Sequence, residues 1–83
     1  MNNDLRIIYD VIRDYLKLHV STKLTLKTTF AELNTDSIDM VEIVMKLEDK
    51  FDIAINDDML LNVKTIEDIQ NVINKLKMKG NFK

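Results

Sequence analysis

Apolar residues recur at the three- and four-residue spacing of an amphipathic helix in three stretches of this chain. The first stretch covers about residues 4–18, with Asn2 or Asn3 as the candidate N-cap. The second covers about residues 37–51, and the third opens with the capping-box pattern TIED and extends over about residues 65–78. The spacing therefore predicts three longer helices.

The segments between these stretches lose the helical period. The connection over residues 19–35 is long and gathers Ser, Thr and Lys, and within it Phe30 and Leu33 could anchor a single turn on the core. The segment DDMLLN, residues 57–62, is long enough for one or two turns. We therefore predict an all-α fold, a small antiparallel four-helix bundle of three longer helices and one short helix with a long first loop.

The length of 83 residues allows one domain with a modest core. We assign residues 1–83 to this domain, with its core over about 4–78 and a basic tail at 79–83. The chain has no Cys, and its single histidine, His19, cannot form a zinc site alone. It shows no signal-peptide pattern and no apolar run of membrane-spanning length, so the sequence predicts a cytoplasmic protein. We also predict that the protein is a monomer and has no metal site.

Acidic residues concentrate in the middle of the chain, although the net charge is only −2. Residues 36–58 hold eight acids and two lysines, a net charge of −6, whereas the other residues hold six acids and ten bases, a net charge of +4. Such a segment attracts basic partners and repels nucleic acid and anionic lipid. We therefore expect a protein partner with a basic surface, and neither a nucleic acid nor a membrane.

Residues 37–51 show two apolar faces on a helical wheel of about 100° per residue. The core face consists of Met40, Ile43, Val44, Leu47 and Phe51. The second apolar set consists of Ile38, Val41 and Met45. It lies beside the acids Glu42, Glu48 and Asp49, and Lys46 and Lys50 fall on the far flank. The second set is either an incidental strip of exposed aliphatic residues or a docking surface.

Thr35, Asp36 and Ser37 are three cap-type residues in a row at the start of the second helix, although one such residue suffices. Asp36 is the best candidate because its charge also suits the positive end of the helix dipole. Ser37 is then left to point outward. No histidine lies nearby in the sequence, and no G-x-S-x-G or S-x-x-K pattern surrounds it. An exposed serine without an activating group is a substrate rather than a catalyst.

These residues resemble those of an acyl carrier protein, whose signature is Asp-Ser-Leu followed by an acidic amphipathic helix. The stretch DSIDMVEIVMKLEDKFDI matches it, and the helix order extends the resemblance over nearly the whole chain. The resemblance implies a carrier and not an enzyme. Ser37 would receive 4′-phosphopantetheine from coenzyme A through a phosphopantetheinyl transferase that uses Mg²⁺. Acyl intermediates of fatty acid or related biosynthesis would then be bound as thioesters to the thiol of this arm.

The resemblance also implies two sets of site residues, the first of which would meet basic patches on the transferase and on acyl-transferring and condensing enzymes. This partner-docking set is Asp36, Ile38, Asp39, Val41, Glu42, Met45, Glu48 and Asp49. The second set would shelter the acyl chain inside the bundle. This acyl-pocket set is Val44, Leu47, Phe51, Ile55, Leu60, Val63 and Ile69.

The chain departs from the family pattern at several positions. Asn34 stands where Gly is usual, and Asn is the next most tolerant residue for positive φ. Ile38 replaces Leu, and Met59 and Leu61 stand where acids are common. Two alternatives therefore stay open. One is a specialised carrier for polyketide, aminoacyl, lipid-modification or toxin-acylation chemistry, and the other is a helical interaction module in which Ser37 is unmodified.

Overall fold

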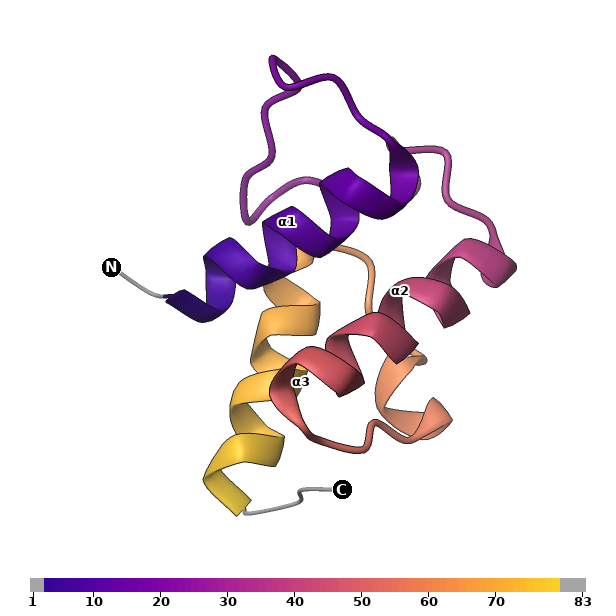
Figure 1. The fold of residues 1–83 in the computed structure, drawn as a ribbon. Helices are drawn as coiled ribbons and strands as arrows, with labels where there is room; N and C mark the ends of the chain where they lie inside the picture. Colours follow the sequence, from indigo (N-terminus) through magenta and orange to yellow (C-terminus); the bar gives the residue numbers. More distant parts are fainter. Residues whose placement is uncertain (1–2, 80–83) are drawn as a thin grey trace.

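The computed structural model describes residues 3–79 and shows an all-helical fold (Figure 1). Its elements are α1 (Asn3–Leu16), α2 (Ser37–Phe51), the 3₁₀ helix η1 (Asp57–Leu60) and α3 (Ile66–Lys79). Within the described residues the β-structure is limited to isolated bridges such as Thr29 with Thr65. The predicted all-α class is therefore confirmed. No helix in residues 3–79 is long and apolar enough to cross a membrane.

Two predictions fall partly outside the described residues. The candidate cap Asn2 is not described, and Asn3 is the first residue of α1. In the predicted basic tail, Lys79 ends α3 and residues 80–83 lie outside the description.

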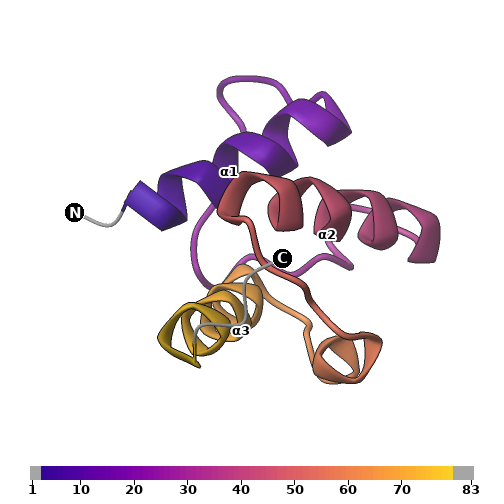
Figure 2. The same ribbon diagram turned by 60° about the horizontal axis from the view of Figure 1, so that its bottom comes forward.

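The helices α1 and α2 lie side by side and run in opposite directions, and α3 crosses them steeply (Figures 1 and 2). The fourth element, η1, is a single turn with no buried residue, and Asn56 before it makes no side-chain cap hydrogen bond. Without a cap or a buried stripe, this segment has little to extend it into an α-helix. The finer prediction of an antiparallel four-helix bundle is therefore not confirmed.

The end of α1 was predicted two residues too late. Lys17 adopts a left-handed conformation with φ of 54°, so the helix ends at Leu16. The N–H of Leu18 donates to the carbonyl of Arg13 at 3.0 Å, and the N–H of Lys17 donates to that of Asp14 at 3.3 Å. These two bonds form a Schellman motif, in which left-handed residues other than Gly or Asn are less usual. The sequence therefore gave no stop signal here.

The long first connection is fixed to the rest of the molecule at both ends. At its start, the Arg13 guanidinium donates to the carbonyl of Thr22 at 2.8 Å. Near its end, Phe30 is buried and its N–H donates to the carbonyl of Lys64 at 2.9 Å, just before α3. The N–H of Leu33 then donates to the carbonyl of Phe30 at 3.2 Å. The predicted turn anchored on Phe30 is confirmed, and it brings the connection to the start of α2.

One apolar core joins the three α-helices and the connections. It consists of Ile8, Val11, Ile12, Phe30, Ile43, Val44, Leu47, Ile53, Ile55, Ile66, Ile69, Ile73 and Leu76. The predicted core face of α2 is confirmed at Ile43, Val44 and Leu47, whereas Met40 and Phe51 are half-buried at its edges. Each fully buried aliphatic side chain stabilises the fold by about 1.5–3 kcal/mol.

The capping box predicted from TIED is confirmed at the start of α3. Thr65 Oγ1 accepts the N–H of Asp68 at 3.1 Å. Asp68 Oδ2 accepts the N–H groups of Lys64 at 2.9 Å and Thr65 at 3.0 Å. These backbone hydrogen bonds favour the carboxylate and lower the pKa of Asp68 below its ordinary value.

We expect Asp68→Asn to lower the free energy of unfolding at neutral pH by about 1 kcal/mol or less. Because the pKa of Asp68 is lowered by folding, its contribution is complete above the unfolded pKa of about 3.9 and is lost as pH falls through the folded pKa. The difference between Asp68→Asn and the parent protein should therefore shrink as pH is lowered. Urea unfolding followed by circular dichroism at neutral and acidic pH measures it, and a constant difference would contradict the prediction.

Candidate functional site

The three cap-type residues before and at the start of α2 have three different environments. Thr35 Oγ1 donates to the carbonyl of Phe30 at 2.7 Å and so closes the turn that precedes the helix. Asp36 is the N-cap, with extended backbone angles, as predicted. Ser37 is the first residue of the helix and is exposed. Asn34 has φ of 60°, so the positive φ expected at this position is also confirmed.

A reciprocal capping box holds the first turn of α2. Asp36 Oδ1 accepts the N–H of Asp39 at 2.8 Å, and Asp39 Oδ2 accepts the N–H of Asp36 at 3.2 Å. The role of Asp39 was not predicted, although the same Asp at the third helical position was accepted in the TIED box. The spacing of Asp39, three residues after the strong N-cap candidate Asp36, was the sequence signal for this capping box.

The hydroxyl of Ser37 makes no hydrogen bond to the residues that the structure describes. The single histidine, His19, lies in the first connection, where its Nδ1 is 2.6 Å from Ser21 Oγ. Ser37 therefore stands exposed at the positive end of a helix dipole, and none of the described residues accepts the proton of its hydroxyl in a hydrogen bond. An oxygen in this setting can be modified by another enzyme.

A groove of about 560 Å³ opens beside Ser37. It is lined by Thr29, Phe30, Ala31, Thr35, Asp36, Ser37, Met40, Val41, Leu60, Val63 and Lys64. The apolar members Met40 and Val41 follow Ser37 by three and four residues and therefore share its side of the helix. That spacing was readable in the sequence, whereas the approach of Phe30 from the connection was not.

The groove gathers only part of the predicted acyl-pocket set. Leu60 and Val63 line it. Four other members are packed inside the core and do not line the groove. They are Val44, Leu47, Ile55 and Ile69. Phe51 is half-buried at the far end of α2, where the Lys77 ammonium lies 5.5 Å from its ring centroid.

The second apolar set of α2 is exposed to solvent. Ile38, Val41 and Met45 expose 71%, 57% and 53% of their surface, and we call these three residues the apolar strip. Three large apolar side chains exposed at helical spacing on one face are typical of a contact surface.

The predicted acidic docking residues divide into two groups. Glu42 and Asp49 are exposed, and Asp49 also lines the cavity between α1 and α2. The Asp36 carboxylate caps the start of α2. Asp39 and Glu48 are half-buried and hydrogen-bonded inside the molecule. Glu48 Oε2 accepts the N–H of Ile55 at 2.7 Å and so ties the end of α2 to the next connection.

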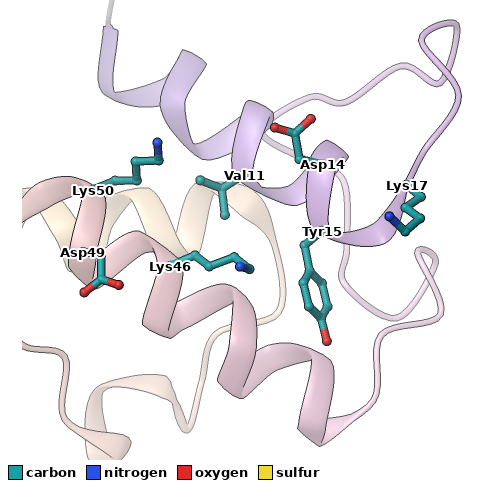
Figure 3. Close-up of a pocket in the computed structure, with 7 residues that line it drawn as sticks. All are labelled: Val11, Asp14, Tyr15, Lys17, Lys46, Asp49 and Lys50. Carbon is teal, nitrogen blue, oxygen red and sulfur yellow. The ribbon is translucent and has the colours of Figure 1, made fainter.

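Two lysines lie on the side of α2 that faces α1, away from the apolar strip (Figure 3). Lys46 and Lys50 line a cavity of about 540 Å³ between the two helices, together with residues of both charges (Figure 3). The Lys46 ammonium lies 5.9 Å from the centroid of the Tyr15 ring. The basic flank predicted on the helical wheel is therefore the side on which α1 packs.

A helical domain that exposes a serine at a helix start, between an apolar groove and a strip edged by acids, is typical of a carrier domain. Residues 6–73 match the family model described as "Phosphopantetheine attachment site". The chain therefore belongs to the acyl carrier protein family, whose prosthetic group is covalently attached 4′-phosphopantetheine.

Relatives with known names agree with this assignment. Acyl carrier protein 2, chloroplastic, of Hordeum vulgare is 38% identical over 83% of this chain, and acyl carrier protein 4, chloroplastic, of Arabidopsis thaliana is 36% identical over 87%. The matched regions cover 54% and 53% of those proteins, so this chain spans about half of their length. The crystal structure of an acyl carrier protein from Thermotoga maritima has the same fold, with a TM-score of 0.75, 24% identity and 92% coverage of both chains.

Proposed function

We propose that this protein carries acyl intermediates as thioesters on a 4′-phosphopantetheine arm attached to Ser37, in fatty acid or related biosynthesis. One observation carries the proposal: Ser37 is exposed and has no hydrogen bond to the described residues, while Thr35 and Asp36 supply the turn and the cap. In the attachment reaction, the Ser37 oxygen forms a bond to phosphorus and the pyrophosphate bond of coenzyme A breaks. Adenosine 3′,5′-bisphosphate leaves, and the hydroxyl proton passes to a base of the transferase.

The residues around Ser37 fit such an arm. The arm supplies a terminal thiol, which the chain itself lacks because it contains no Cys. The capping box of Asp36 and Asp39 holds the turn that presents the hydroxyl. The groove beside it offers the side chains of Leu60 and Val63, and the predicted shelter for an acyl chain would extend from there toward the buried members of the acyl-pocket set.

The proposed partners are a phosphopantetheinyl transferase and acyl-transferring and condensing enzymes. Their basic side chains would meet Glu42 and Asp49, while apolar side chains cover the apolar strip. The monomeric state, the cytoplasmic location and the antiparallel four-helix arrangement stay predictions. The chloroplastic names of the relatives make a plastid the alternative location.

Incubation of the protein with coenzyme A, Mg²⁺ and a permissive phosphopantetheinyl transferase tests the proposal. Intact mass spectrometry should show the addition of one phosphopantetheine group. Subsequent loading of the thiol with an acyl group should add the corresponding acyl mass. A protein that stays unmodified with transferases that modify other carriers would favour the unmodified interaction module instead.

One surface feature favours a specialised pathway as the second candidate. Met59 and Leu61, on and after η1, are 37% and 77% exposed at positions where many carriers have acids. Lys46 and Lys50 also lower the negative charge of α2, but they lie on its α1 side. Enzymes that read a fully acidic surface would lose several contacts here, each worth up to about 1 kcal/mol.

We therefore expect a general transferase to accept this carrier, and enzymes of primary fatty acid synthesis to use it less well than a strongly acidic carrier from the same cell. Side-by-side rates of malonyl transfer and condensation on the two loaded carriers measure the difference. Equal rates for the two carriers would contradict this expectation and would favour a role in primary fatty acid synthesis.

A further inference from the structure

The carboxylate of Asp39 links α1 to the turn that presents Ser37. Its Oδ2 accepts the N–H of Asp36 within the capping box, and its Oδ1 accepts the hydroxyl of Tyr15 at 3.2 Å. Tyr15 belongs to the last turn of α1, so this hydrogen bond spans 24 positions of the sequence. One carboxylate therefore joins the end of one helix to the cap of the next.

The position of the Tyr15 ring is fixed from several sides. The residue is half-buried, and its ring packs between α1 and α2 with the Lys46 ammonium 5.9 Å from its centroid (Figure 3). Burial, and then the hydrogen bond to Asp39, raise the pKa of Tyr15 above its ordinary value. The hydroxyl therefore stays protonated and remains a donor at neutral pH.

The first turn of α2 otherwise has little packing of its own. Asp36, Ser37 and Ile38 are all exposed, and a connection without a long helix precedes them. A helix end held by few buried contacts opens locally at low free-energy cost. A second hydrogen bond to Asp39 opposes this opening, because Asp39 must keep its position for the capping box to form.

We infer that Tyr15 is a positioning residue for the modification of Ser37, because its hydroxyl fixes the Asp39 carboxylate and thereby the turn that presents the serine. This inference rests on the proposed function of Ser37. Tyr15 acts through Asp39 and is not required to contact the transferase. Its loss should therefore lower kcat, the step that needs an aligned hydroxyl, more than it raises KM.

The variants Tyr15→Phe and Tyr9→Phe provide a matched comparison. Both remove one hydroxyl from a half-buried tyrosine of α1, but among the described residues only the Tyr15 hydroxyl reaches α2 in a hydrogen bond. With coenzyme A, Mg²⁺ and a phosphopantetheinyl transferase, Tyr15→Phe should lower kcat by about five-fold, the effect of one net hydrogen bond. Tyr9→Phe should leave both kcat and KM unchanged.

Amide hydrogen exchange provides a readout that does not depend on the transferase. In Tyr15→Phe, the N–H groups of Asp36 and Asp39 should exchange faster, while amides in the middle of α2 keep their protection. Unchanged kcat in Tyr15→Phe, or unchanged exchange at these two amides, would overturn the inference. If the parent protein itself is not modified, the proposed function fails, and the exchange experiment still decides whether Tyr15 holds the capping box.

Discussion

Ser37→Ala is expected to abolish the addition of phosphopantetheine completely. Alanine has no oxygen to form the phosphodiester, and no neighbouring hydroxyl occupies the same position, since Thr35 Oγ1 donates to the Phe30 carbonyl. The fold should be retained because Asp36, not Ser37, accepts the N–H of Asp39. Intact mass should therefore show no increase, while far-ultraviolet circular dichroism and the unfolding midpoint stay close to those of the parent protein.

The chain offers a direct control for this experiment, since Ser21 is its only other serine. Ser21 is exposed in the first connection, and its hydroxyl lies 2.6 Å from His19 Nδ1. Ser21→Ala should be modified as fully as the parent protein. Modification of the Ser37→Ala variant, or its loss in Ser21→Ala, would show that the arm is attached elsewhere.

Glu42→Lys is expected to slow modification by about tenfold at low ionic strength, because it reverses a charge that a basic partner would approach. Glu42 is exposed at the edge of the apolar strip, so the reversal should change stability little. The effect should shrink as salt shortens the Debye length to about 8 Å at physiological ionic strength. Initial rates of transfer at several salt concentrations measure both the slowing and its screening.

Asp10→Lys is the matched control, since it makes the same charge change at an exposed position of α1. It should be modified at nearly the parent rate at every salt concentration. Equal slowing in both variants would mean that only the net charge matters, and no slowing in Glu42→Lys would mean that this acid does not meet the partner.

Glu48 lies on the same helix but differs from Glu42 in its contacts. Its carboxylate accepts the N–H of Ile55, a residue of the buried core. Reversing the charge of Glu48 would therefore remove an internal hydrogen bond as well as an acid, and comparison of the two acids requires a stability measurement beside each rate. The helical wheel placed both acids beside the second apolar set, and the resemblance gave both a docking role. Neither indicates that the backbone of the segment after α2 donates a hydrogen bond to Glu48.

The sequence was sufficient for features that depend on residues close together in the chain. Periodicity predicted the spans of α2 and α3, and cap chemistry predicted Asp36 as the N-cap and the Thr65–Asp68 capping box. The same local reasoning left Ser37 exposed and set the apolar strip apart from the core face. Local spacing decides these features because residues within one helical turn are neighbours whatever the rest of the fold, so cap side chains reach the free N–H groups and apolar side chains share a face.

Only the tertiary structure decided which distant residues meet. It joined Phe30 from the connection with Leu60 and Val63 to make the groove beside Ser37. It also turned the Glu48 carboxylate inward and brought the Tyr15 hydroxyl to Asp39. These contacts follow from how α1 packs against α2 and how the connections cross the core. That packing cannot be predicted from a single sequence, because many alternative pairings of apolar helix faces would bury a similar apolar area.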